Sequence, residues 1–216
     1  FFTTGPSQTP GLWAREGSGA PGIADVNFGA PNVNNTALSN FRMSASGRSS
    51  FQAALRGASV TQLNDTSIWM ASSGGPTLVV REGGATGFIA NVNYGQMISH
   101  VISDNVQVVL RSNLAGTGVT SLNDEGIFSV GPAGNFLIAR EGTVAAGAGT
   151  AVFSGGGLGT TIGNPNVNAS GRVAFRSPLA NGGVTATNNS GVWIATPGAP
   201  TTLSLVQREN TAAPGL

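Results

Sequence analysis

The chain has 216 residues, enough for one large domain or two small ones with a substantial buried core. Only 9% of the residues are charged, the net charge is +1 and every basic residue is arginine, so the dense basic patch that nucleic-acid binding requires is missing. No apolar run is long enough to span a membrane. An apolar content of 40% argues against disorder, and 33 glycines and 11 prolines indicate many turns.

The composition favours an exported protein. There is no cysteine, which suits either a reducing compartment or an exported protein that needs no disulfide. The absence of lysine, the low charge and the abundance of Gly, Asn, Thr and Ser favour export to the periplasm, the cell surface or the extracellular space. The chain begins at Phe1 without a basic and apolar leader, so we expect either that a signal has been removed or that this is a segment of a longer protein.

The first recurring element along the chain is a strand-like run. Its three copies occupy positions 46–51, 105–110 and 170–175. In the second copy Val106, Val108 and Leu110 occupy alternate positions, and Val173 and Phe175 do the same in the third. This period-2 pattern predicts strands with one buried face.

The second recurring element is a pair of polar residues that precedes an aromatic residue. The pairs are 64–65, 123–124 and 188–189, and the aromatic residues are Trp69, Phe128 and Trp193. From copy to copy these markers shift by the same two steps as the strand-like runs, which indicates a true internal repeat. Because a phenylalanine replaces tryptophan in one copy, the position favours core packing over an exposed stacking surface.

The third recurring element is an Arg-Glu pair that closes an apolar run. The pairs are Arg15–Glu16, Arg81–Glu82, Arg140–Glu141 and Arg208–Glu209, which recur at a similar spacing. The runs before the last three pairs are apolar on both faces, which predicts interior strands. Since neighbouring residues of a strand point to opposite faces, we expect each arginine to be mostly buried and to bind a carboxylate or carbonyl oxygen of an adjoining strand, in the same way in each unit.

The fourth element is a later segment that carries Phe28, Tyr94 or Phe153. No segment has a sustained 3.6-residue period, so little or no helix is expected. The sequence therefore predicts an all-β fold of four-stranded repeats of about 60 residues, β-propeller-like, with two packed β-sandwich-like sheets as the alternative. We expect a single repeat domain, 1–216, of approximate units 1–40 (partial), 41–100, 101–165 and 166–216 (partial), the first lacking its first strand and the last its final strand.

These motifs resemble those of exported bacterial tandem-repeat proteins of the choice-of-anchor type. Their unit reads roughly N-x-x-G-x-V-A-F-R, then N-D-x-G-I-W, then R-E-G-x-x-A-P-G. Residues 168–176 match the first part, 123–128 the second, and 15–22 the third, and the resemblance covers essentially the whole chain. Departures include Thr66-Ser67 in place of the usual Gly, and Asn210 after the last Arg-Glu pair. The resemblance implies export and a propeller-like repeat fold, and it implies no activity.

The residues argue against most kinds of enzyme. His100 is the only histidine, and although Asp104 and two serines are near it in sequence, no G-x-S-x-G motif surrounds any serine, so a catalytic triad is not favoured. One histidine without cysteine excludes ordinary zinc sites, and the lack of lysine excludes Schiff-base chemistry. Four of the nine acids are the Arg-Glu glutamates, whose recurrence indicates a structural role. No catalytic residue and no cofactor is predicted.

The Asn-Asp turns offer weak calcium candidates, Asp65 and Asp124. Calcium prefers six to eight oxygen ligands, and the third copy, Asn188-Asn189, has no carboxylate. An Asx-type turn, in which the side chain bonds to its own backbone, is therefore the favoured interpretation.

The sequence thus predicts a non-catalytic, exported structural or interaction protein, an accessory subunit or surface module that docks on a larger assembly. The alternative is a lectin-like, ligand-binding propeller that uses Trp13, Trp69 and Trp193 as stacking surfaces, and a hydrolase is less favoured. The expected partner is another protein, a larger assembly or a second copy joined through terminal sheet edges. No nucleic acid and no transmembrane segment is expected.

Overall fold

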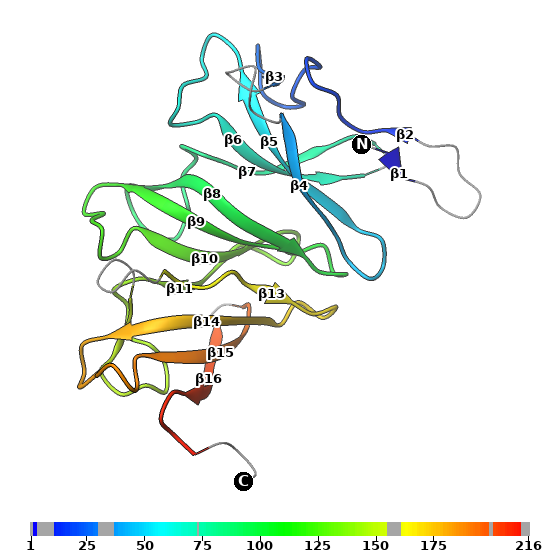
Figure 1. The fold of residues 1–216 in the computed structure, drawn as a ribbon. Helices are drawn as coiled ribbons and strands as arrows, with labels where there is room; N and C mark the ends of the chain where they lie inside the picture. Colours follow the sequence, from blue (N-terminus) through cyan, green and yellow to red (C-terminus); the bar gives the residue numbers. More distant parts are fainter. Residues whose placement is uncertain are drawn as a thin grey trace.

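The computed structural model describes residues 2–3, 11–29, 37–72, 74–154, 161–198 and 201–212. These residues form sixteen strands and contain no helix, which confirms the all-β prediction. Three larger sheets follow one another along the chain from the N-terminal to the C-terminal side of the molecule (Figure 1). A short antiparallel pair precedes them, formed by β1 (Phe2–Thr3) and β2 (Gly11–Leu12).

Each larger sheet is an antiparallel meander in chain order. The first sheet consists of β3 (Asn27–Phe28), β4 (Leu38–Met43), β5 (Ser49–Arg56), β6 (Thr66–Ala71) and β7 (Thr77–Arg81). The second consists of β8 (Val92–Ile102), β9 (Val108–Gly116), β10 (Glu125–Val130) and β11 (Phe136–Arg140). The third consists of β12 (Val152–Phe153), β13 (Asn166–Val167), β14 (Val173–Ala180), β15 (Ser190–Thr196) and β16 (Thr202–Arg208).

The three sheets share one plan. In the second sheet the first strand, β8, is continuous, whereas in the first and third sheets it is divided into two pieces that both pair with the second strand. The strand-like runs at 46–51, 105–110 and 170–175 lead into β5, β9 and β14, which hold the same second place in their sheets. We call residues equivalent when they share a place in this plan, as Phe51, Leu110 and Phe175 do in the second strands.

The sheets are offset by one strand from the sequence units 41–100 and 101–165. Phe28 pairs with Leu55, and Phe153 pairs with Leu179, so each aromatic segment opens the sheet that follows it. A turn of the Arg-Glu-Gly type joins each sheet to the next, for example at Gly83, whose φ of +78° suits glycine.

The strand β9 differs from the predicted one-sided pattern. Val108 and Leu110 face the core of the second sheet, but Val109 between them packs into the core of the third. All three are buried because sheets cover β9 on both faces. Val106 lies in the preceding turn with a φ of +67°, so the predicted alternation began two residues too early.

The Arg-Glu strands β7, β11 and β16 are edge strands, so the prediction that they are interior was wrong. Their apolar residues on both faces have another cause. In β7, Leu78 packs with the core of the first sheet, whereas Val79 packs with the core of the second. A bulge at the same place in each sheet leaves Val79, Ile138 and Val206 as the extra residues. An edge strand between two sheets is therefore apolar on both faces.

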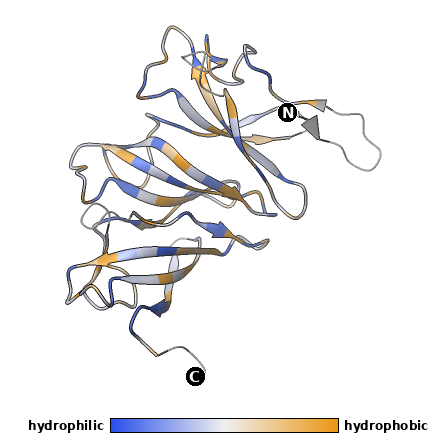
Figure 2. Cartoon of the chain, viewed as in Figure 1, coloured by the Kyte–Doolittle hydropathy of each residue, from blue (hydrophilic) through white to orange (hydrophobic). Residues whose placement is uncertain are grey.

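One aromatic pair recurs in the core of each sheet. The ring centroids lie 5.0–5.1 Å apart in edge-on geometry in the pairs Phe28–Trp69, Tyr94–Phe128 and Phe153–Trp193. Trp69 and Trp193 are fully buried, which confirms their predicted core role. Figure 2 shows hydrophobic residues interspersed with hydrophilic ones along the strands of each larger sheet. Each sheet thus builds its own core and shares part of it with the next.

Candidate functional site

The loop before the third strand of each sheet is held by an asparagine. Its side-chain oxygen accepts a hydrogen bond of 2.7–2.9 Å from the backbone N–H of a threonine three residues earlier, in the pairs Thr61–Asn64, Thr120–Asn123 and Thr185–Asn188. The prediction of a side-chain-stabilised turn is confirmed in kind, but the bond runs to an earlier residue rather than a later one. The asparagine side chain therefore closes the loop through a hydrogen bond with the backbone of an earlier residue.

The arginines of the Arg-Glu pairs clamp these loops from the edge strand. The Nε atom donates to the backbone carbonyl of the loop asparagine at 2.8–2.9 Å, from Arg81 to Asn64, from Arg140 to Asn123 and from Arg208 to Asn188. The predicted common hydrogen bond is therefore present in all three sheets, although the arginines are half-buried rather than mostly buried. Arg15 and Glu16 are exposed.

We expect Arg140→Ala to lower the free energy of unfolding by about 2 kcal/mol, because a backbone carbonyl loses its charged hydrogen-bond donor. Urea unfolding followed by tryptophan fluorescence measures the change. Arg172→Ala, at an exposed arginine outside the clamp, is the control and should change the value by less than about 0.5 kcal/mol. Equal effects of the two substitutions would contradict the clamp.

The calcium candidates Asp65 and Asp124 sit beside the clamps. Their backbone carbonyls accept hydrogen bonds from Leu55 and Leu114 at 2.7 Å, which joins the loop to the second strand of the sheet. Burial raises the pKa of the following Arg-Glu glutamate in each case, and the nearby aspartate carboxylate raises it further. Over the part of the chain that the structure describes, no group of three or more His, Asp or Glu side chains is arranged to hold a metal ion.

The second sheet departs from its neighbours beside the Arg-Glu glutamate. In the first sheet the Thr66 hydroxyl donates to Glu82 Oε2 at 2.6 Å, and in the third the Ser190 hydroxyl donates to Glu209 at 3.4 Å. The equivalent residue of the second sheet is Glu125, which has no hydroxyl to donate. Its carboxylate faces that of Glu141, and both side chains are buried.

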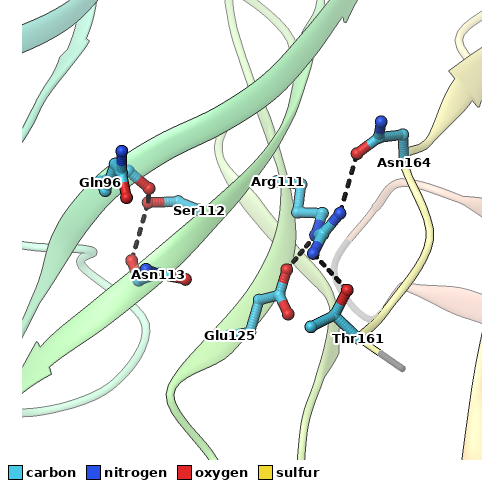
Figure 3. Close-up of polar contacts among 7 residues, drawn as sticks. All are labelled: Gln96, Arg111, Ser112, Asn113, Glu125, Thr161 and Asn164. Atoms are coloured by element: carbon cyan, nitrogen blue, oxygen red, sulfur yellow. Dashed lines mark hydrogen bonds and ion pairs between the residues drawn. The ribbon is translucent and has the colours of Figure 1, made fainter. Parts of the chain in front are cut away.

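The carboxylate of Glu125 is held by Arg111, which also bridges to the third sheet (Figure 3). Arg111 Nε forms an ion pair with Glu125 Oε1, Nη1 donates to Asn164 Oδ1 at 3.0 Å, and Nη2 donates to Thr161 Oγ1 at 2.6 Å. The planar guanidinium thus satisfies an acid on β10 and two polar groups on the segment that leads into β13. Sequence comparison of the copies could have identified Glu125, since hydroxyl residues occupy the other two positions.

Burial and the charges of Glu125 and Asp124 raise the pKa of Glu141 to about 8. Glu141 Oε2 is buried without a hydrogen-bond partner among the described residues. In the first sheet burial also raises the pKa of Glu82, but the hydrogen bond from Thr66 opposes the shift. At neutral pH Glu141 therefore stays largely protonated, beside the ion pair that Arg111 forms with Glu125.

His100 lies on β8 and is fully buried against the first sheet. Neither ring nitrogen has a hydrogen-bond partner among the described residues, whereas Arg42 Nε donates to the backbone carbonyl of His100 at 3.1 Å. Burial, and then the charge of Arg42, lowers the pKa of His100 to about 4. Asp104 is instead bound by the backbone N–H of Ser46 at 2.8 Å. The structure therefore does not bring His100 and Asp104 together as a catalytic pair.

The turns between the first and second strands of the three sheets converge on one pocket of about 240 Å³. Equivalent four-residue segments line it, 42–45, 101–104 and 166–169. The turns are also linked in sequence order, because Ser46 binds Asp104 and Asn105 Nδ2 donates to the carbonyl of Ser170 at 3.3 Å. The pocket is polar and open, and sequence analysis did not identify it, because the three segments differ in residue type.

The first sheet exposes apolar side chains where the second buries them. Met43 is 72% exposed and Phe41 40%, whereas their equivalents Ile102 and His100 are 6% and 0% exposed. In the third sheet Pro165, the equivalent of Phe41 and His100, is also buried. We call the side of β4 that carries Phe41 and Met43 the head face. In the second and third sheets, the preceding sheet covers the equivalent surface.

The third sheet has a matching exposed surface on its opposite side. Val192 is 40% and Val206 45% exposed, whereas their equivalents Ile127 and Ile138 are 0% and 5% exposed. Arg176, the equivalent of Arg111, is exposed as well. We call the surface formed by Arg176, Val192 and Val206 the tail face. In the first and second sheets, the following sheet covers the equivalent surface.

No helix among the described residues has the length and apolar character needed to cross a membrane. Searches of curated proteins and of solved structures each found no match. Residues 2–215 match the model of a family of unknown function (DUF7453), which spans nearly the whole chain. The chain therefore belongs to this family, DUF7453.

Proposed function

We propose that this protein is a non-catalytic, exported structural or interaction module that docks on a larger assembly through its head and tail faces. The observation that carries the proposal is the exposure of Met43 and Val192 at positions whose equivalents are buried between sheets. Exposed apolar surface of this kind, rimmed by polar residues, is typical of protein–protein interaction sites. Export rests on the composition and on the family resemblance of the repeat motifs.

The charged residues support a structural rather than a catalytic role. Arg81, Arg140 and Arg208 are bound to backbone carbonyls, and Arg111 is bound to Glu125 and to the third sheet. The paired acids Glu125 and Glu141 are buried, so substrate does not reach them. A lectin role receives less support, because Trp69 and Trp193 are in the core and offer no face to a sugar ring.

Photo-crosslinking in the native source tests the proposal. We expect a chain with p-benzoylphenylalanine at position 43 or 192 to form a specific adduct, because both faces are covered in the assembly. The same label at Leu63, which is 76% exposed in a loop away from both faces, is the matched control and should form none. Mass spectrometry of the adduct identifies the partner, and a chain that stays free at positions 43 and 192 contradicts the proposal.

A further inference from the structure

We propose that Asn181 is a site of spontaneous covalent modification, at which the backbone nitrogen of Gly182 attacks the side-chain amide and the amide nitrogen is lost as ammonia. The product is a cyclic imide, which water opens to aspartate or isoaspartate. The reaction requires no partner protein, so it does not depend on the proposed interaction function.

The two residues lie in the loop that joins β14 to β15. Asn181-Gly182 is the one place in the chain where glycine follows asparagine. A Cβ atom on the second residue would hinder the approach of its nitrogen to the asparagine side chain, and glycine has none. In the first and second sheets Gly57 and Gly116 occupy the position of Asn181, so the reactive dipeptide is confined to the third sheet.

Both reacting groups are accessible and unengaged. Asn181 and Gly182 are exposed, and the side-chain amide of Asn181 makes no hydrogen bond with any described residue. The N–H of Gly182 is also without a partner among the described residues, whereas the equivalent N–H of Thr117 donates to the carbonyl of Asn91 at 3.1 Å. The attacking nitrogen and the amide carbon are therefore both free to react.

The exposure of this loop does not depend on what adjoins the third sheet. The equivalent loops begin at Gly57 and Gly116, and both glycines are exposed. The second sheet has a neighbouring sheet on each face, and its loop is exposed nevertheless. Exposure is thus a property of this position in the sheet, at the end of the second strand.

The loop backbone has the conformation that asparagine and glycine adopt most readily. The angle φ is +60° at Asn181, +57° at Gly182 and +75° at Gly183. The carbonyl of Asn181 accepts a hydrogen bond from the N–H of Val184 at 3.0 Å, which closes a turn with the two glycines at its centre. Because glycine restricts backbone rotation least, the peptide unit between Asn181 and Gly182 can turn toward the side chain at a low steric cost.

The reaction balances with water as its one co-reactant. The Gly182 nitrogen loses its proton to solvent base and forms a bond to Cγ of Asn181, while the bond from Cγ to Nδ2 breaks and that nitrogen leaves as ammonia. Water then adds to one of the two imide carbonyl carbons and breaks its bond to the Gly182 nitrogen, which recovers a proton. Opening at Cγ gives aspartate, and opening at the backbone carbonyl carbon gives isoaspartate, in which the main chain runs through Cγ.

The product has a different charge and, as isoaspartate, a longer backbone. The new carboxylate brings the formal net charge of the chain from +1 to zero, and proteins near zero net charge self-associate more readily. Isoaspartate adds one carbon to a tightly packed turn, since a Cβ atom on Gly182 would lie 2.4 Å from the backbone nitrogen of Ala151. The modification therefore changes both the charge of the chain and the shape of this loop as the protein ages.

Three asparagines provide internal controls, because they share the exposure and positive φ of Asn181 but precede larger residues. They are Asn40, Asn91 and Asn210, with φ values of 48°, 59° and 61°.

Peptide mapping by mass spectrometry measures the reaction, after the purified chain has been incubated in oxygen-18 water at pH 7.5 and pH 9. We expect residue 181 to lose ammonia and gain one oxygen-18 atom about tenfold or more faster than the three controls. The rate should rise with pH, because the attacking nitrogen must lose its proton. Hydroxylamine, which cleaves cyclic imides, should cut the chain between residues 181 and 182.

Asn181→Gly is the matched variant, since it places at this position the glycine that the other two sheets have. It should fold as the wild type does, which circular dichroism checks, and hydroxylamine should not cut it at this position. An Asn181 amide that lasts as long as those of Asn40, Asn91 and Asn210 overturns the proposal, and so does hydroxylamine cleavage that is unchanged in Asn181→Gly.

Discussion

Glu141→Gln is expected to remove most of the loss of stability that the wild type undergoes as the pH rises from 4.5 to about 8. The pKa of Glu141 is raised in the folded protein from 4.5 to about 8, so the folded state binds more protons than the unfolded state across this window. The free energy of unfolding of the wild type should therefore fall with increasing pH, by up to about 1.4 kcal/mol per pH unit. Glutamine has no proton to lose.

The amide of glutamine also keeps a hydrogen-bond donor at this position at every pH, whereas Glu141 loses its donor when it ionises. It can donate to Glu125 without disturbing the ion pair with Arg111, as the hydroxyl of Thr66 donates to Glu82 in the first sheet. We expect the variant to match the wild type within about 1 kcal/mol at pH 5 and to exceed it by about 2 kcal/mol or more at pH 9.

Urea unfolding across pH 5–9 measures the difference, with Glu82→Gln as the matched control. The pKa of Glu82 is also raised, but the Thr66 hydrogen bond opposes the shift, so the control should show the same trend with a smaller amplitude. Stability curves that run parallel for the wild type and Glu141→Gln across this range would show that Glu141 does not titrate in it.

His100→Phe is expected to stabilise the protein, and most strongly in acid. The pKa of His100 is lowered from 6.5 to about 4 by burial and by Arg42, so the unfolded state takes up the proton more readily. The wild type should keep its full stability above pH 6.5 and lose about 3 kcal/mol as the pH falls to about 4. Phenylalanine cannot be protonated, and it occupies the equivalent position in the first sheet, Phe41.

The same replacement removes two buried ring nitrogens that have no partner among the described residues, which should add about 1 kcal/mol at pH 7.5. Thermal unfolding at pH 7.5 and pH 5 measures both effects. Phe41→His, which places a histidine at the exposed equivalent, is the matched control and should not increase acid sensitivity. If His100→Phe differs in stability from the wild type by the same amount at both pH values, His100 does not titrate between them.

Several features of the molecule could be predicted from local sequence because they repeat. The spacing of Trp69, Phe128 and Trp193 predicted equivalent core positions, and the structure confirms them with one edge-on aromatic pair in each sheet. The recurring arginines predicted a common hydrogen bond, which the structure also confirms. Where a position has the same neighbours in each sheet, the same type of residue recurs there, so the sequence reveals it.

Contacts between sheets could not be read in this way. The apolar residues on both faces of β7, β11 and β16 indicated interior strands, because the sequence does not show whether a face is covered by the same sheet or by a neighbouring one. The alternation expected in β9 failed for the same reason, since Val109 packs on the third sheet. The pairing of Glu125 with Arg111 depends on two segments, β9 and β10, that only the meander brings together.

The sequence by itself determined the all-β class, the positions of the second and third strands of each sheet and the lack of cysteine and lysine. The period of the hydrophobic residues and the types of turn residue are local properties, because they determine the structure within a single strand or loop. The tertiary structure decided which strands lie at edges, where the acid pair and His100 are buried, and that Met43 and Val192 are exposed. The exposure of these two side chains depends on how the sheets are arranged, which the residues of one sheet do not determine.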